Sequence, residues 1–142
     1  MILYLDATAF ATLFVLEEES SLVHAQVDAV DVVATSRVSF TELCDALATR
    51  RHEGRLTDRE LAQIRRHLDD AWPTFALVEV DERAAGTLAL SHRLGGFAGL
   101  HVAAALELAR HADGVPVLFC TFDARQRLAA ETEGLLVMPG AS

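Results

Sequence analysis

Short apolar runs alternate along the chain with longer segments whose apolar residues recur at helical spacing. Runs of three or four residues are too short for helices and suit buried strands. They cover residues 2–5, 32–34, 77–80, 117–120 and 135–137. Strands that alternate with helices favour a parallel sheet covered on both faces. The pattern therefore predicts an α/β/α sandwich around a central, mainly parallel sheet of about five strands.

Capping residues, prolines and glycines set the ends of the predicted helices. Thr57 followed by Glu60 is typical of a capping box, and Pro73 ends the helix that begins there. Gly95 and Gly96 predict a break before the next helical segment. On these grounds a first helix is expected to begin at residue 7. Further helices are expected over residues 20–29, 39–52, 57–72, 82–93, 100–110 and 123–133.

Length and composition predict a single globular domain over residues 1–142. The chain is 51% hydrophobic and 23% charged, which excludes a disordered chain. No apolar stretch approaches the roughly 20 residues that span a bilayer. The first apolar run stops at Asp6 and has no basic region before it, so neither a signal peptide nor an anchor is expected. We therefore expect a cytoplasmic protein without a membrane partner.

Charge and residue usage narrow the possible functions. The net charge of −9 argues against broad coating of nucleic acid, but all 12 basic residues are arginines, which bind phosphate groups well. The lack of lysine excludes Schiff-base chemistry, phosphoryl-accepting receiver domains and dehalogenase-type phosphatases, which need a lysine. Cys44 and Cys120 lie in apolar surroundings and are expected to be reduced packing residues.

Three acidic residues occupy positions where a carboxylate could face a shared site. Asp6 and Asp123 follow the apolar runs 2–5 and 117–120, and the carboxyl ends of parallel strands are where open α/β sheets place their ligands. Glu42 lies near the start of a mostly apolar helix and is expected to point into a cleft. Each acid also has a simpler explanation. Asp6 and Asp123 could cap helices, and Glu42 could be an ordinary first-turn residue that the helix dipole favours.

Carboxylates that converge in one cleft need a compensating charge. Two unit charges 4 Å apart repel by about 4 kcal/mol at an effective dielectric constant near 20. Without lysine, such a site must bind a proton, an arginine or a cation. Carboxylate oxygens suit Mg²⁺, with Mn²⁺ as a substitute. Metal-assisted hydrolysis of a phosphodiester is the reaction that this set of residues serves best.

At these residues the chain resembles the PIN-domain family, specifically the VapC ribonuclease toxins of type II toxin–antitoxin modules. The similar segments are YLDATAF with Asp6 and Thr8, SFTELCDAL with Glu42, LGGFAGLHVAAALELA, and CTFDARQRLAAETEGL with Asp123. They span essentially the whole chain. No single motif is specific, but their order and spacing together are.

One position departs from the family pattern. The third motif of the family has an Asp where this chain has Ala98, so the resemblance implies a metal-binding quartet of Asp6, Glu42, a missing acid and Asp123. Either the chain was inactivated at this position, which we favour because the rest of the motif is intact, or it is a naturally degenerate member. A naturally degenerate chain would be a non-catalytic PIN binding module.

The resemblance implies a mechanism for these residues. The acids would hold one or two Mg²⁺ ions that activate water for in-line attack on an RNA phosphodiester, leaving a 5′-phosphate and a 3′-hydroxyl. The RNA would be a tRNA or an rRNA. Thr8 is expected to hydrogen-bond Asp6 or a metal-bound water. His101 is expected to have a structural or cleft-lining role, with metal binding as the alternative, and Thr121 is expected to line the cleft.

The resemblance also implies partners. Members of the family are usually homodimers and assemble with a small VapB-like antitoxin, as heterotetramers or larger complexes. The helices expected over residues 20–29 and 57–72 could form a groove for an antitoxin helix. Arg50, Arg51, Arg55, Arg125 and Arg127 are candidates for RNA contacts, although each could equally lie on a solvated helix face.

Overall fold

Five strands form one wholly parallel sheet in the computed structural model, which describes residues 1–140. Their order across the sheet is β3-β2-β1-β4-β5, so that β1 lies in the middle. The strands are β1 (Ile2–Leu5), β2 (Val32–Ser36), β3 (Ala76–Val78), β4 (Val117–Cys120) and β5 (Leu136–Met138). The predicted α/β class is confirmed.

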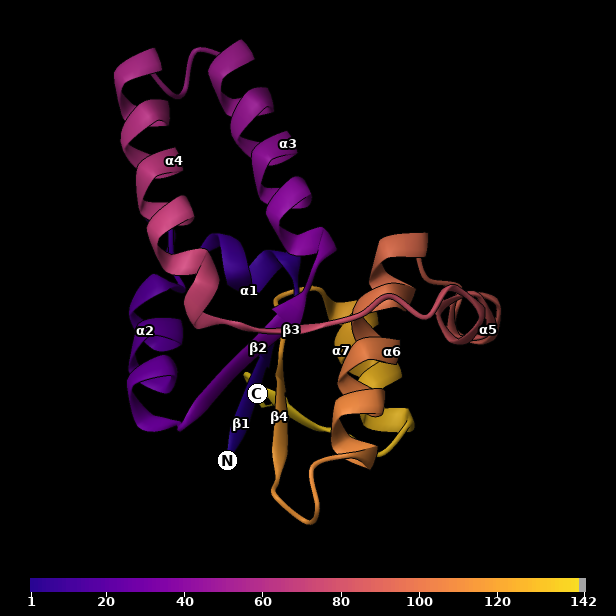
Figure 1. Cartoon of the computed structure of the whole chain (residues 1–142). Helices are drawn as coiled ribbons and strands as arrows, with labels where there is room; N and C mark the ends of the chain where they lie inside the picture. The colour runs from indigo at the N-terminus through magenta and orange to yellow at the C-terminus, as the bar shows by residue number, and fades with distance from the viewer. Residues whose placement is uncertain (141–142) are drawn as a thin grey trace.

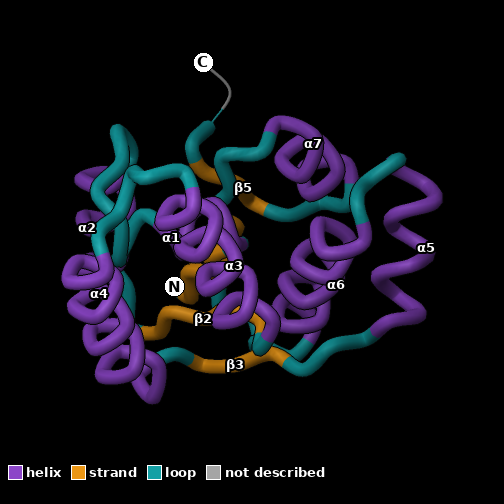
Figure 2. Tube along the Cα trace, turned by 90° about the horizontal axis from the view of Figure 1, so that it is seen from above, coloured by secondary structure: helices purple, strands orange, loops and turns teal. Residues whose placement is uncertain are grey.

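Helices cover both faces of this sheet. In Figure 2, α1, α2 and α4 lie on one side of the strands and α5, α6 and α7 on the other. In Figure 1, α3 and α4 run side by side and extend beyond the carboxyl ends of the strands. Their bounds are α1 (Ala7–Ala11), α2 (Ser20–Ala29), α3 (Val38–His52), α4 (Asp58–Ala71), α5 (Glu82–His92), α6 (Gly96–Arg110) and α7 (Ala124–Thr132). A short 3-10 helix over Trp72–Thr74 follows α4.

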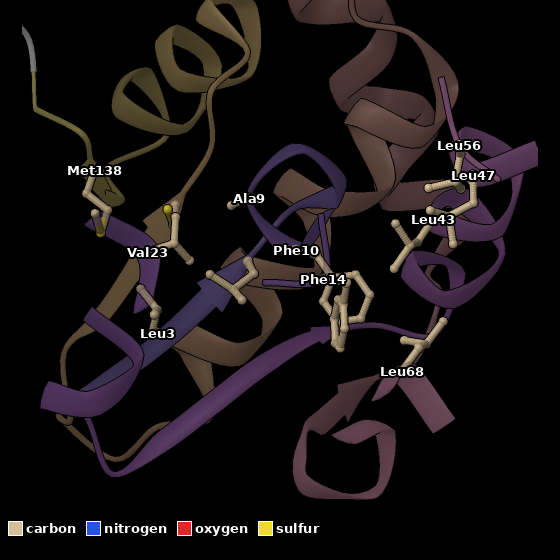
Figure 3. Close-up of a cluster of buried hydrophobic side chains, with 12 residues drawn as sticks. Leu3, Ala9, Phe10, Phe14, Val23, Leu43, Leu47, Leu56, Leu68 and Met138 are labelled. Atoms are coloured by element: carbon tan, nitrogen blue, oxygen red, sulfur yellow. The ribbon is translucent and has the colours of Figure 1, made fainter. Parts of the chain in front are cut away.

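The hydrophobic core is divided by the sheet. Leu3 and Leu5 pack with Phe10 and with residues of α2, α3 and α4 on one face, a cluster shown in Figure 3. Tyr4 points to the opposite face, where it packs with residues of α5, α6 and α7. This alternation follows from the period of two in a strand. It places the polar end of Tyr4 on the α6 side of the sheet.

Local signals set most helix ends as expected. Both reciprocal hydrogen bonds of the capping box between Thr57 and Glu60 are present at the start of α4. Helix α1 is only five residues long. After it the chain tightens into turns that join each backbone N–H to a carbonyl three residues earlier, from Thr12 to Ala9 and from Leu13 to Phe10. None of the helices within residues 1–140 is long and apolar enough to cross a membrane.

Helix α6 begins four residues earlier than the glycine pair predicts. Gly95 is its extended N-cap and Gly96 its first residue, so the predicted start at residue 100 is wrong. The cause is tertiary packing: a Cβ atom at Gly99 would lie 2.6 Å from the carbonyl oxygen of Ala85, so α6 packs closely against α5 through this glycine. Such packing outweighs the low helix propensity of glycine. Ala98 therefore lies in the first turn of α6.

Candidate functional site

Asp6 lies at the carboxyl end of the central strand and is completely buried. Its Oδ1 atom accepts a hydrogen bond from the backbone N–H of Ala9, at 2.9 Å, and thereby caps α1. The cap that was the simpler explanation for Asp6 is therefore present. A cap requires only that a side-chain oxygen accept a backbone N–H group, and it does not require the side chain to be buried. The second oxygen of this carboxylate, Oδ2, has a different partner.

Two threonines hold the Asp6 carboxylate from either side. Thr8 Oγ1 donates to Oδ1 of Asp6 at 2.7 Å, and Thr121 Oγ1 donates to Oδ2 at 2.6 Å. Each hydroxyl also accepts a backbone N–H from the segment after β4, Thr8 from Phe122 at 2.9 Å and Thr121 from Asp123 at 3.0 Å. The expected bond between Thr8 and Asp6 is thus confirmed. Together the two threonines tie the carboxyl ends of β1 and β4 together around one acid.

The burial of Asp6 changes the pKa of its carboxyl group. Loss of water around the carboxylate raises the pKa of Asp6, and the hydrogen bonds from Thr121, Ala9 and Thr8 counter this effect. The nearby His101 also acts to lower the pKa. The net direction is upward, which means that folding holds this carboxylate in a place where its charge is costly. A residue of this kind is typical of a functional site.

We expect Thr121→Val to destabilise the protein more than Thr8→Val. Thr121 is completely buried, so its loss leaves Oδ2 of Asp6 and the N–H of Asp123 without partners, at a cost of about 1–3 kcal/mol. Thr8 is exposed, and water can replace its hydroxyl. Urea unfolding of both variants measures the two costs. Equal losses would contradict the role given to Thr121.

Glu42 belongs to a second polar group on the α6 side of the sheet. Its Oε1 lies 2.7 Å from Nε2 of His101, and Nδ1 of His101 lies 2.8 Å from the hydroxyl of Tyr4. His101 and Tyr4 are buried, whereas the Glu42 side chain is 20% exposed. Burial raises the pKa of Tyr4, and the charges of Asp6 and Glu42 raise it further. Both carboxylates therefore lie near the same tyrosine.

Asp123 is half-buried and caps α7. Its Oδ1 accepts both cap hydrogen bonds, from the backbone N–H groups of Arg125 at 2.9 Å and Gln126 at 3.1 Å. This again confirms the simpler explanation for the residue. Because both bonds fall on one oxygen, Oδ2 stays outside the cap. Through Thr121, the backbone of Asp123 is linked to the Asp6 carboxylate.

The donor chemistry of these acids suits a hard cation, but their side chains do not form a closed cage. Among residues 1–140, no three His, Cys, Asp or Glu side chains lie close enough together to hold a metal ion. Within the described part of the chain, Oδ2 of Asp6 accepts only the Thr121 hydroxyl, and the His101 bond falls on Oε1 of Glu42. Each acid thus keeps an oxygen with bonding capacity. Mg²⁺ is commonly bound through one or two carboxylates and several waters, so the chemistry of these oxygens suits the ion, with Asp6 buried and Glu42 and Asp123 partly exposed.

A cavity of about 710 Å³ adjoins the site between α1, α3 and the start of α6. Thr8, Glu42 and the exposed Phe97 contribute to its wall, along with apolar residues of α1 and α3. Glu42 and Thr8 therefore face a cleft, as the sequence predicts, whereas His101 and Thr121 are buried in the core and are not part of its lining. Phe97 was not identified from the sequence, because an exposed aromatic residue beside a glycine pair gives no periodic signal.

The candidate arginines differ in their surroundings. Arg50, Arg51 and Arg55 pair with acidic residues on and around α3, respectively Glu17, Asp58 and Glu53. Arg125, near Asp123, donates to the carbonyl oxygen of Arg93 at 3.4 Å and is otherwise exposed.

The two cysteines, Cys44 and Cys120, form no disulfide, and burial raises the pKa of the Cys120 thiol to about 12.

Sequence comparison finds two ribonucleases of similar length. The chain is 35% identical to ribonuclease VapC45 of Mycobacterium tuberculosis strain CDC 1551 and to ribonuclease VapC49 of strain H37Rv. Each match covers 97% of this chain and 95% of the relative. No family model matches the chain.

Solved structures show the same fold at lower sequence identity. PAE2754 from Pyrobaculum aerophilum is similar with a TM-score of 0.66 and 17% identity, over 96% of this chain and 92% of that chain. FitAcB from Neisseria gonorrhoeae is similar with a TM-score of 0.65 and 19% identity, over 96% of both chains. The arrangement of β1, β4 and the helices around Asp6 is thus that of a known fold.

Proposed function

Because the chain belongs to the VapC family of ribonucleases, with the PIN-domain fold, we propose that it is an endoribonuclease toxin whose site is formed by Asp6, Glu42 and Asp123. The observation that carries this proposal is the buried Asp6, held by two threonines at the carboxyl end of the central strand. A carboxylate with a raised pKa gains most from a bound cation.

The site residues would hold Mg²⁺, with Mn²⁺ as a substitute. Asp6 through Oδ2, together with Glu42 and Asp123, would supply the protein oxygens, and water would complete the coordination. When bound, the ion would polarise a phosphoryl oxygen and lower the pKa of a coordinated water. The threonines keep Asp6 oriented, and the cap at Asp123 holds that carboxylate at the start of α7.

Ala98 weakens this site. It lies in the first turn of α6, where the resemblance to the family implies a fourth carboxylate. The chain as it stands would therefore bind Mg²⁺ weakly and cleave RNA slowly. This position also supports a second candidate function, that of a degenerate PIN module that binds RNA or a partner without cleaving it.

Product chemistry tests the proposed reaction. We expect the Ala98→Asp variant, incubated with total RNA and Mg²⁺, to leave 5′-phosphate and 3′-hydroxyl ends, because water rather than the ribose 2′-hydroxyl attacks the phosphorus. EDTA should abolish the cleavage. Ends that carry a cyclic phosphate, or cleavage that persists in EDTA, would contradict the proposal. Sequencing the cut ends would test whether the target is a tRNA or an rRNA.

A small VapB-like antitoxin is the proposed protein partner of a homodimer or a larger assembly. A cavity of about 630 Å³ opens between α2 and α4, the two helices expected to form the groove. It is lined mainly by apolar side chains, including Phe14, Val27 and Phe75, with His24 and His67 at its wall. Such a groove suits the apolar face of an amphipathic helix.

A further inference from the structure

We propose that Tyr4 and His101 are positioning residues, which hold the Glu42 carboxylate at the proposed metal site through a buried chain of two hydrogen bonds. The assignment deepens the proposed function, and it rests on that function for the role of Glu42 as a ligand. His101 itself is not a ligand in this assignment, because both of its ring nitrogens already have partners.

The two hydrogen bonds join three elements that are far apart in the sequence. Tyr4 lies on β1, His101 on α6 and Glu42 on α3. The contacts span 97 residues from Tyr4 to His101 and 59 residues from Glu42 to His101. The Tyr4 ring also stacks on Phe119 with centroids 5.6 Å apart and meets the His101 ring edge-on at 5.9 Å. Both rings are thus fixed on several sides.

The direction of the hydrogen bonds follows from the acceptor at one end. An ionised carboxylate can only accept, so Nε2 of His101 must carry the proton in its bond to Glu42. In the neutral imidazole Nδ1 is then unprotonated, and the Tyr4 hydroxyl donates a hydrogen bond to it. In the imidazolium Nε2 still carries a proton. The hold on Glu42 is therefore the same in both states of the ring.

Burying these polar side chains costs free energy of folding, which indicates that they do more than fill space in the core. The hydrophobic core on this side of the sheet packs around them with Ala34, Val102 and Phe119, among others. An apolar pair of similar size would fill the same space without buried polar groups that require partners. Glu42 has a flexible side chain with 20% exposure, and its only restraint among these contacts is His101. The buried chain restrains Oε1, and the second oxygen, Oε2, is the one left for a ligand in the cavity that Glu42 lines.

Three substitutions and one matched control separate positioning from general stability. His101→Leu removes the donor to Glu42, whereas His101→Gln can retain an amide N–H near the place of Nε2. Tyr4→Phe keeps the ring stacked on Phe119 and removes only the hydroxyl. His111→Leu is the matched control, since His111 contacts Glu107 at 2.8 Å near the end of the same helix but is exposed. Thermal unfolding identifies any variant that fails to fold.

Mn²⁺ affinity, measured by calorimetry in the Ala98→Asp background, is the first readout. We expect binding about 10-fold weaker in His101→Leu, the effect typical of lost outer-shell contacts. His101→Gln should recover part of the affinity, Tyr4→Phe should lie between the two, and His111→Leu should match the parent. Equal affinity in His101→Leu and the parent, or equal loss in His101→Leu and His101→Gln, would overturn the proposal.

The second readout does not depend on metal or RNA. Nitrogen-15 NMR of the unsubstituted chain should show His101 with a protonated, slowly exchanging Nε2, and Glu42→Gln should change that resonance. A bare Nε2, or a resonance that Glu42→Gln leaves unchanged, would overturn the positioning role. If the NMR result holds while no variant binds Mn²⁺ or cleaves RNA, the proposed function fails and the hydrogen-bonded chain stands.

Discussion

Ala98→Asp is expected to raise Mg²⁺-dependent RNA cleavage by about 100-fold or more. A carboxylate at the first turn of α6 would add a fourth oxygen ligand to the site of Asp6, Glu42 and Asp123. Metal ions contribute several kcal/mol of transition-state stabilisation, and each 1.36 kcal/mol is about tenfold in rate. The measurement is the initial rate of cleavage of a labelled RNA by both proteins at matched Mg²⁺ concentrations.

Stability measurements provide an independent view of the same substitution. Without Mg²⁺ the added charge repels the nearby carboxylates, so we expect Ala98→Asp to unfold at a lower temperature than the parent. Mg²⁺ should restore that loss, because a ligand that binds only the native state stabilises it. Ala98→Asn has nearly the same size without the charge and should show neither effect. Equally low cleavage in all three folded proteins would contradict the nuclease proposal.

The positions that the sequence predicted well are those governed by local chemistry. The apolar run at residues 2–5 has the length of a buried strand, and the structure places β1 there. Helix α2 has the predicted bounds, and the capping box at Thr57 forms because its partners are three residues apart. The bond from Thr8 to Asp6 is equally local, spanning two residues.

The features that the sequence did not predict depend on contacts between distant segments. The early start of α6 follows from the approach of Gly99 to Ala85, which no local propensity encodes. Tyr4 was missed because its hydroxyl finds His101 only once β1 and α6 are packed together. One signal was available: Asp6 directly follows the strand that carries Tyr4, and side chains two residues apart in extended backbone share a face of the sheet. A polar tip on that face, inside an apolar run, indicates a buried partner.

Asp6→Asn is expected to abolish cleavage without destabilising the protein. In the Ala98→Asp background we expect the rate to fall by about 100-fold or more, because the loss of the anionic ligand removes the charge that holds the cation. The amide can preserve most of the local contacts. Its oxygen can accept from Ala9 and Thr8, and its N–H can donate to the second lone pair of the Thr121 oxygen, so that only the hydrogen of the Thr121 hydroxyl loses its acceptor.

The stability of Asp6→Asn follows from the raised pKa of Asp6. The native state binds this proton more tightly than the unfolded state, so the stability contributed by this group is present below the usual pKa near 3.8 and is lost as pH rises through the raised value. At neutral pH the buried charge is therefore a cost, which the amide removes. We expect urea unfolding at neutral pH to give Asp6→Asn a free energy of unfolding equal to or above that of the parent. Asp6→Ala, which leaves Thr121 and the N–H of Ala9 without an acceptor, should lie below both. If Asp6→Asn were as unstable as Asp6→Ala, the negative charge of Asp6 would stabilise the fold. The buried charge would then not be a cost in folding free energy that is kept for the function of the site.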